Sequence, residues 1–241
     1  MHHTVDIHNL YYTYGDGTQA LRGIDLFVAP GEKVALVGPN GSGKSTLLLH
    51  LNGILRGEGE VRVCGQAVQD DRLGEIRAAV GLVFQDPDDQ LFCQSVYDDV
   101  AFGPIYMGFD RDEVDDRVAR ALRSVGMQGA QQRVSHHLSQ GEKKRVAIAS
   151  VLAMDPEILV LDEPSAGLDP RSRRELIQLL DALPQTMLVA SHDMHLVAEL
   201  FPRMIVIDQG RIAADGATAE LMRNPSLLEA HGLEAPCADS G

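Results

Sequence analysis

Residues Gly38 to Ser45 form a glycine-rich segment that could bind phosphate. They match the pattern G-x-x-x-x-G-K-[ST], in which flexible glycines let successive backbone N–H groups point toward phosphate oxygens. The basic side chain supplies a point charge for β- and γ-phosphates, and the final hydroxyl is a ligand for Mg²⁺. The residues of the segment, with the first residue of the helix expected after it, are Gly38, Pro39, Asn40, Gly41, Ser42, Gly43, Lys44, Ser45 and Thr46.

The flanking sequence favours this interpretation over a simple glycine-rich turn that caps a helix. An apolar run at residues 33–37 precedes the segment, and a helix-like run at residues 46–52 follows it. A strand, a loop and a helix in this order are the context in which the motif binds a nucleotide. The sequence therefore predicts a nucleoside triphosphate, with Mg²⁺, at this loop.

The composition limits the other classes of protein. The chain of 241 residues carries 21 basic and 35 acidic side chains, for a net charge of −14. An acidic chain lacks the basic surface that nucleic acids and anionic lipids require, so we expect neither partner. The longest apolar stretches, such as residues 146–154, are shorter than the ~20 residues of a spanning helix. We expect no signal peptide and no direct membrane insertion.

Cysteine and histidine give no sign of a metal centre. The three cysteines are widely spaced, and the nine histidines show no ligand spacing, which favours a reducing cytosol and free thiols. The cysteines are Cys64, Cys93 and Cys237.

The remaining pattern predicts an α/β fold. Alternation over residues 5–30 around an Asp-Gly pair predicts a β-hairpin. Four apolar runs predict buried parallel strands, each followed by polar residues that should converge on one site. These runs are residues 34–37, 80–84, 158–161 and 187–190. Residues 86–150 predict a helical insertion, with one helix over Arg111–Val125 that ends at Gly126. Residues 234–241 predict a flexible tail.

Five further segments occur in the order typical of ATP-binding-cassette (ABC) ATPases. Taken alone, Leu138-Ser-Gln-Gly-Glu142 is a capping box that begins a helix. It also resembles the family's signature motif, and the other segments favour that reading. They are residues 157–163, similar to the Walker B strand, residues 165–169, similar to the D-loop, residues 191–193, similar to the histidine switch, and Gln85, which begins the Q-loop.

The resemblance implies a fold and a domain organisation. It implies a P-loop NTPase (RecA-like) core with an N-terminal antiparallel β-subdomain and an inserted α-helical subdomain. On this basis residues 1–85 and 151–233 form the core, and residues 86–150 form the helical subdomain.

The resemblance also implies roles for residues that hydrolyse ATP. Glu163 would orient or deprotonate the attacking water, with His192 and Gln85 as further catalytic residues. Ser45, Gln85 and Asp162 would hold Mg²⁺. Tyr14 is similar to the aromatic residue that stacks on adenine, with Tyr11 and Tyr12 as alternatives.

In the family, two cassettes pack head to tail, and the signature of one chain closes over the ATP of the other. The resemblance therefore implies a homodimer in which Ser139, Gly141 and Asp169 approach the partner's nucleotide. This chain departs from the commonest signature, Leu-Ser-Gly-Gly-Gln, at Gln140 and Glu142.

Residues 83–104 narrow the resemblance to the ATPase subunit of energy-coupling-factor importers, which take up vitamins or cobalt and nickel ions. Such subunits act at the cytoplasmic face of the membrane through transmembrane and substrate-binding partner subunits. The short C-terminus favours the cobalt/nickel group, with cobalt the first expectation and a vitamin such as biotin the alternative. Less favoured alternatives are a soluble cassette ATPase and a nucleotide-gated module without hydrolysis.

An acidic segment at residues 86–99 supports a hypothesis about the membrane partner. It contains five aspartates and no basic residue, with apolar Leu91, Phe92, Val96 and Tyr97 interleaved. We expect a docking groove with an acidic rim, next to the nucleotide-sensing Gln85.

Overall fold

The alternating N-terminal residues form the predicted hairpin. The computed structural model describes residues 5–234, in which strands β1 (Val5–Thr13) and β2 (Gln19–Val28) pair antiparallel. The Tyr14 amide donates to the Thr18 carbonyl at 2.9 Å, and Gly17 adopts a positive φ of 88° in the turn. The Asp-Gly turn is thus confirmed, because glycine tolerates this left-handed backbone.

Two strands that the sequence pattern did not reveal complete the antiparallel sheet. They are β4 (Glu58–Val63) and β5 (Gln66–Ala67), and the strand order is β2-β1-β4-β5. Most of β4 is exposed, so it lacks the apolar alternation that marks a half-buried strand. Pairing with β1 holds it in the sheet.

The second sheet contains the four predicted buried strands as neighbours. Its order is β10-β9-β3-β8-β7-β6, and all pairs are parallel except β9 with β10. The strands are β3 (Lys33–Val37), β6 (Val80–Val83), β7 (Ile158–Asp162), β8 (Thr186–Ala190), β9 (Arg203–Asp208) and β10 (Arg211–Ala217). Since β3, β8, β7 and β6 are adjacent, their carboxyl ends meet at one edge, as expected.

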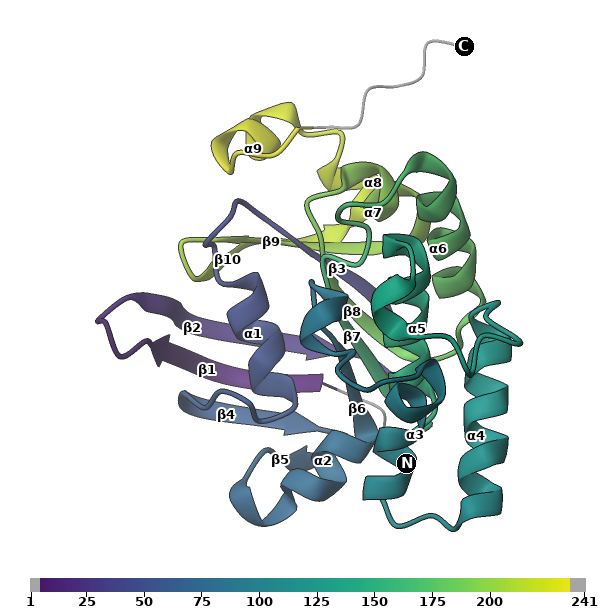
Figure 1. The fold of residues 1–241 in the computed structure, drawn as a ribbon. Helices are drawn as coiled ribbons and strands as arrows, with labels where there is room; N and C mark the ends of the chain where they lie inside the picture. Colours follow the sequence, from purple (N-terminus) through teal and green to yellow (C-terminus); the bar gives the residue numbers. More distant parts are fainter. Residues whose placement is uncertain (1–4, 235–241) are drawn as a thin grey trace.

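Helices cover both faces of this sheet (Figure 1). The α-helices are α1 (Lys44–Leu51), α2 (Leu73–Ala79), α3 (Val96–Tyr106), α4 (Arg111–Ser124), α5 (Gln140–Leu152), α6 (Pro170–Ala182), α7 (Met194–Leu200), α8 (Thr218–Leu221) and α9 (Pro225–Ala230). Short 3₁₀ turns are η1 (Asp70–Arg72), η2 (Pro87–Asp89) and η3 (Ser135–His137).

Alternate residues of each buried strand enter two different hydrophobic clusters. Val34 and Leu36 pack in one cluster with α1 and the antiparallel sheet, while Ala35 and Val37 pack in the other with α3 to α7. Successive side chains of a strand point to opposite faces, so a strand buried on both faces is apolar throughout. This explains the uninterrupted apolar runs in the sequence.

The helical insertion is present and shares the core of the sheet. Helix α4 begins after Asp110 and ends before Gly126, which has a φ of 69°, and it buries the predicted apolar face. Its buried residues are Val114, Val118, Ala121 and Leu122. The insertion has no hydrophobic cluster of its own among the described residues, and the boundaries at residues 85 and 150 stay a prediction.

Two predictions concern residues that lie partly outside the described part of the chain. The predicted tail, apart from Glu234, lies outside the described residues, as does Cys237. Cys64 and Cys93 are free thiols. No helix within residues 5–234 has the length and apolar character needed to cross a bilayer.

The acidic segment 86–99 is less acidic at the surface than the sequence suggested. Asp99 is only 4% exposed, and its carboxylate accepts from the Phe92 and Cys93 amides at 3.0 and 2.9 Å and from the Ser135 hydroxyl. Asp88 forms an ion pair with Lys143 of α5 at 2.6 Å. The expected acidic rim was therefore wrong at Asp99, which is buried, and it is weakened at Asp88, whose charge Lys143 of another helix neutralises.

The apolar residues of this segment also divide into two groups. Leu91 and Val96 are core residues, with 1% and 0% of their surface exposed, whereas Phe92 is 62% exposed. Tyr97 is half-buried, and its hydroxyl donates to Asp115. Only Phe92 of the four is free to line a docking surface.

Asp99→Ala should destabilise the helical part of the chain. The substitution leaves two amides and a hydroxyl without their acceptor, which should lower the free energy of unfolding by about 2–4 kcal/mol. Denaturant unfolding followed by circular dichroism measures this change. Asp89→Ala, which removes an exposed carboxylate of the same segment, should change stability by less than about 0.5 kcal/mol. Equal stability of the two variants would show that Asp99 does not organise the segment.

Candidate nucleotide site

The loop from Gly38 to Ser45 curls tightly between β3 and α1. Gly38 has a φ of 151°, and a Cβ there would lie 2.0 Å from the Ile207 carbonyl oxygen. Gly43 has a φ of 109°, and a Cβ there would lie 2.6 Å from the Ala20 carbonyl oxygen. Only glycine fits either position, which accounts for two of the glycines in the motif.

Lys44 is buried inside the curl. It is 6% exposed, and its Nζ donates to the carbonyls of Gly38 at 2.8 Å and Pro39 at 3.0 Å. Burial lowers the pKa of Lys44, while the nearby Glu163 and Asp162 carboxylates raise it. The loop therefore encloses a cation that could move from these carbonyls to phosphate oxygens.

The end of β7 brings a carboxylate next to the loop. The Asp162 side chain accepts a hydrogen bond from Ser45, and burial raises the pKa of Asp162 while Ser45 and Lys44 lower it. Its Oδ1 is buried and has no hydrogen-bond partner among the described residues. A hydroxyl and a carboxylate with a free oxygen form a donor set that fits Mg²⁺.

Glu163 and His192 meet at the ends of β7 and β8. His192 Nδ1 lies 2.7 Å from Glu163 Oε2, and the His192 amide donates to the same oxygen at 3.2 Å. The Glu163 amide donates to the Ala190 carbonyl at 2.9 Å, and Glu163 has a left-handed φ of 45°. The two predicted residues are thus neighbours because their strands are hydrogen-bonded to each other.

Gln85 follows β6, the edge strand next to β7. Its side chain is exposed, and its carbonyl accepts from Lys144 Nζ at 3.0 Å. The topology brings Gln85 to the edge of the sheet that holds Asp162, but within residues 5–234 no hydrogen bond joins the two side chains.

Of the three neighbouring tyrosines, Tyr14 is the most exposed, and it contacts the helix that follows the loop. Its hydroxyl is 2.9 Å from Thr46 Oγ1, and its ring is 38% exposed. Tyr12 packs edge-on against both Tyr14 and His50, at 4.9 Å in each case, and Tyr11 lies under Gly23. The geometry favours Tyr14 as the ring available to a base.

The signature residues form a helix cap in this chain. The Ser139 hydroxyl accepts from the Glu142 amide at 3.3 Å, and the Glu142 carboxylate accepts from the Ser139 amide at 2.9 Å. The capping box read from the sequence is therefore confirmed. A Cβ on Gly141 would lie 2.8 Å from Ser172 Oγ, so this glycine also permits close packing of α5 on α6.

Asp169 has a local role that the sequence analysis missed. Its carboxylate caps α6 by accepting from the Arg171 and Ser172 amides at 2.9 and 3.0 Å. The sequence Asp-Pro at the start of an amphipathic run was the available signal. Among the described residues, no hydrogen bond or ion pair joins Ser139, Gly141 or Asp169 to the phosphate-binding loop.

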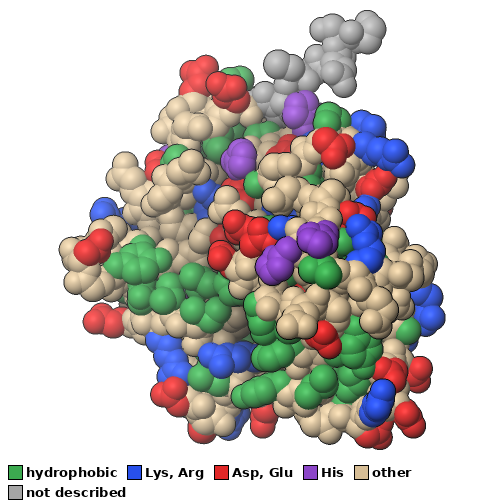
Figure 2. Space-filling model, viewed as in Figure 1, with side chains coloured by type: hydrophobic (Ala, Val, Ile, Leu, Met, Phe, Trp, Pro, Cys, Tyr) green, Lys and Arg blue, Asp and Glu red, His purple; other side chains and the backbone are tan. Residues whose placement is uncertain are grey.

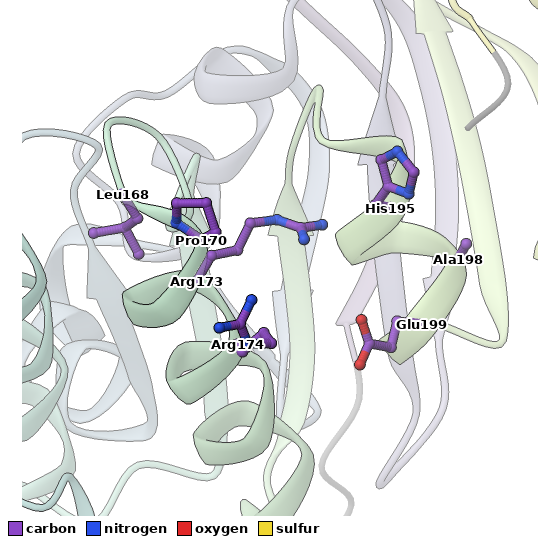
Figure 3. Close-up of a pocket in the computed structure, with 7 residues that line it drawn as sticks. All are labelled: Leu168, Pro170, Arg173, Arg174, His195, Ala198 and Glu199. Atoms are coloured by element: carbon purple, nitrogen blue, oxygen red, sulfur yellow. The ribbon is translucent and has the colours of Figure 1, made fainter. Parts of the chain in front are cut away.

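Two hollows lie beside these segments. A cavity of about 800 Å³ is lined by residues 38–40, 165–168, 192–195 and 232–234, together with Arg173. A second, of about 560 Å³, lies between α6 and α7, and Figure 3 shows Arg173 reaching across from α6. Arg173 forms a two-pronged ion pair with Asp193 at 2.5 and 2.8 Å. This pair links the helix after the D-loop to the histidine segment.

Lys144 and Gln90 are further residues that position the site and that the sequence analysis did not single out. Lys144 is 4% exposed and donates to the Gln85 carbonyl at 3.0 Å and to the Glu163 carbonyl at 3.1 Å. The Gln90 side chain bridges the Phe84 amide, at 3.2 Å, to the Ala147 carbonyl, at 2.8 Å. A run of basic residues on a helix usually faces solvent, so no local pattern indicated a buried lysine.

Comparison with known proteins decides the family. A model of the ABC transporter family matches residues 21–166. The chain is 55% identical over 233 residues to a putative ABC transporter ATP-binding protein of Gloeobacter violaceus, which covers 95% of this chain and 96% of that protein. The chain belongs to the ABC transporter ATPase family. It is therefore an ATPase with the P-loop NTPase fold, and it binds ATP.

A second relative places this ABC ATPase in the energy-coupling-factor type. The chain is 49% identical over 238 residues to the energy-coupling factor transporter ATP-binding protein EcfA of Methanothermobacter thermautotrophicus. That match covers 96% of this chain and 76% of the relative.

Two solved structures agree with the fold. The structure of cbiO1 from Clostridium perfringens, described as part of the ABC transporter complex cbiONQ, has a TM-score of 0.83 and 39% identity, and the match covers 94% of this chain and 93% of cbiO1. A dimeric ATP-binding cassette in a post-hydrolysis state, bound to ADP and phosphate, has a TM-score of 0.81 and 28% identity. That match covers 89% of this ABC ATPase and 98% of the cassette.

Lys144→Met should lower both stability and turnover of this ATPase. The variant keeps an unbranched side chain one atom shorter but removes two hydrogen bonds, which should destabilise the fold by about 1–3 kcal/mol. Because Gln85 and Glu163 lose a common anchor, the rate of hydrolysis should fall more than the affinity for ATP. Steady-state kinetics and calorimetric titration separate these effects.

Lys143→Met is the matched control on the same helix, because it removes only the ion pair with Asp88. It should leave the ATPase rate nearly unchanged. A Lys144→Met protein with native stability and rate would contradict a positioning role for this lysine.

Proposed function

We propose that this chain is the ATP-hydrolysing subunit of an energy-coupling-factor importer that takes up a transition-metal ion, cobalt first. It works as a homodimer at the cytoplasmic face of the membrane, through partner subunits that cross the bilayer. One observation carries the catalytic part of the proposal: Lys44, the Asp162 and Ser45 pair and the Glu163 and His192 pair meet at neighbouring strand ends.

The chemistry of these groups supports ATP hydrolysis. The loop from Gly38 to Thr46 would cradle the phosphates, and Lys44 would neutralise their charge. Ser45, Asp162 and Gln85 would hold Mg²⁺, which neutralises charge between the β- and γ-phosphates when bound. Glu163 would accept a proton from the attacking water, with His192 orienting the carboxylate through their 2.7 Å contact. Tyr14 would stack on the base.

A homodimer supplies the groups that a single chain lacks at its own loop. Ser139 and Gly141 have no hydrogen bond to the loop within the described chain, so they are available to the nucleotide of a second copy, as Asp169 would be. The dimeric cassette with bound ADP and phosphate provides a precedent of the same fold. Since one chain carries Glu163, His192 and the signature, both sites of a homodimer would be competent.

An exposed apolar patch on and before α3 supports a membrane partner. Its residues are Phe92, Phe102, Ile105 and Tyr106, with exposed fractions of 62, 52, 60 and 84%. Phe92 and Phe102 pack edge-on at 5.1 Å. Figure 2 shows hydrophobic side chains gathered low on this face, over the region where Figure 1 places α3. Exposed aromatic patches of this kind mark interaction sites.

The patch overlaps the acidic segment at residues 86–99, which directly follows Gln85. Asp89 and Asp98 are near it along the chain and are exposed, so they could pair with basic side chains of a partner helix. Gln90 ties the start of this segment to α5. We therefore propose that this patch, with the two carboxylates at its edge, is where a membrane subunit docks.

The transported substrate is proposed from likeness alone. The resemblance of residues 83–104 to the energy-coupling-factor group and the likeness to cbiO1, part of cbiONQ, favour a cobalt importer. A vitamin importer is the second candidate. Uptake of radioactive cobalt or of biotin by cells that express the chain with its membrane partners distinguishes the two.

Glu163→Gln should bind ATP normally and stop turnover. Without the carboxylate that accepts a proton, the γ-phosphate stays intact and continues to join two chains, so the variant should accumulate as a dimer with Mg-ATP. General-base loss typically lowers the rate ~10²–10⁴-fold. Light scattering after size exclusion, with and without Mg-ATP, measures the dimer. Native turnover by this variant would refute the role of Glu163.

Replacing Phe102 and Tyr106 together by serine should weaken docking. Both rings are exposed, so the fold and the ATPase activity of the isolated protein should change little, while co-purification with the membrane subunits and transport should fall. Phe27→Ser, which removes an equally exposed ring on β2 (54% exposed), is the control. Normal assembly of the double variant would place the docking site elsewhere.

A further inference from the structure

The first turn of α5 carries an acidic residue where the proposed function requires an anion to approach. The amino end of this 13-residue helix carries the positive end of the helix dipole, and the first amides of a helix have no partner within the helix, which favours a phosphate. Glu142 lies in that turn, and a carboxylate there opposes the approach of a triphosphate from a second copy. A compensating cation would remove this conflict.

Arg133 is that cation. Its Nη1 donates to Glu142 Oε1 at 2.6 Å, and its Nη2 donates to Oε2 at 3.3 Å. The Arg133 contact, with the Ser139 amide, holds the pKa of Glu142 at about 2, so the carboxylate stays ionised at neutral pH. The pair is then neutral, and the helix end regains its preference for anions.

The same contact allows the Ser139 hydroxyl to change its hydrogen-bond partner. In this structure the Ser139 hydroxyl donates to Glu142 Oε2 at 3.0 Å. To donate to a phosphate, the hydroxyl must turn away from this carboxylate. The two N–H groups of Arg133 keep the carboxylate hydrogen-bonded after that turn, so the rearrangement leaves no acceptor without a donor.

The backbone of Arg133 is held in place by the helix that carries the apolar patch. The Arg133 carbonyl accepts from the Val96 amide of α3 at 3.0 Å, and the Arg133 amide donates to the Ala130 carbonyl at 2.9 Å. The side chains of Arg133 and Glu142 are 46% and 24% exposed. The pair is thus fixed in position and accessible to a second chain.

We propose that Arg133 is a positioning residue for ATP-driven dimer formation, because it neutralises Glu142 and releases the Ser139 hydroxyl for the nucleotide of the partner copy. This inference rests on the proposed function, in which the signature closes over the ATP of a second chain. The inference also explains how the signature can carry Glu142 in place of the more common glutamine. An acidic residue is compatible with an anionic ligand when an arginine neutralises it.

Dimer formation in the Glu163→Gln background tests the proposal without depending on turnover. The ATP concentration that gives half-maximal dimer, measured by light scattering, should rise about three- to tenfold on Arg133→Ala. Arg133→Lys should recover part of the loss, because lysine keeps the charge but not the two-pronged contact. Arg120→Ala, which removes an exposed arginine on α4 (58% exposed), should leave the value unchanged.

A second carboxylate variant separates charge from structure. Glu142→Gln keeps a residue that can complete the capping box but removes the negative charge. In that background Arg133→Ala should have little effect on the ATP requirement, and thermal unfolding should show that every variant is folded.

Two results would overturn the proposal on its own. One is an Arg133→Ala variant whose ATP concentration for half-maximal dimer is unchanged. The other is an Arg133→Ala substitution that raises this concentration equally in proteins with Glu142 and in proteins with the Glu142→Gln substitution. A different result would overturn the proposed function: Glu163→Gln protein that binds Mg-ATP but never dimerises with Arg133 intact. In that case the inference about Arg133 would be wrong together with the proposed function.

Discussion

The close approach of three backbone segments around the phosphate-binding loop is the constraint on which the rest of this ATPase depends. Gly38 leaves no room for a side chain against the Ile207 carbonyl, and Gly43 leaves none against the Ala20 carbonyl. The Gly210 amide donates to the Ser42 carbonyl at 2.9 Å, and the Arg22 amide donates to the Gly210 carbonyl at 2.8 Å. The loop, the antiparallel sheet and the β9–β10 turn are therefore joined at one place by main-chain contacts, which fixes where the strand ends converge.

Polar contacts add to the apolar core in connecting this centre to the surrounding helices. Lys144 joins the carbonyls after β6 and β7, and Arg173 joins α6 to the segment that carries His192. Hydrogen bonds to charged groups are directional and can exchange partners, whereas close-packed side chains resist displacement. Such an arrangement suits an enzyme in which binding and loss of a γ-phosphate change the positions of helices outside the site.

Several acidic side chains of the helical insertion have specific partners. Asp99 accepts hydrogen bonds from amides, Asp88 forms an ion pair with Lys143, and Glu142 forms an ion pair with Arg133. An acidic sequence thus presents fewer free carboxylates than its net charge suggests. What remains exposed near α3 is largely aromatic, and this is the surface that we assign to a membrane subunit.

The phosphate-binding loop, the four central strands, the hairpin turn and helix α4 could all be predicted from the amino-acid sequence. These features follow from local rules: glycine at strained backbone positions, apolar runs in strands buried on both faces, and a 3.6-residue period along a helix. The order of the motifs was also sufficient to indicate the family, because each motif is a short local pattern.

The long-range partners of the polar side chains, in contrast, depend on the folded chain. Strands β4 and β10 have little apolar pattern of their own and exist through pairing with β1 and β9. Likewise, Lys144 and Asp99 look like surface residues along the chain and become buried connectors in the fold. Their roles depend on groups distant in sequence, and a local pattern carries no information about such contacts.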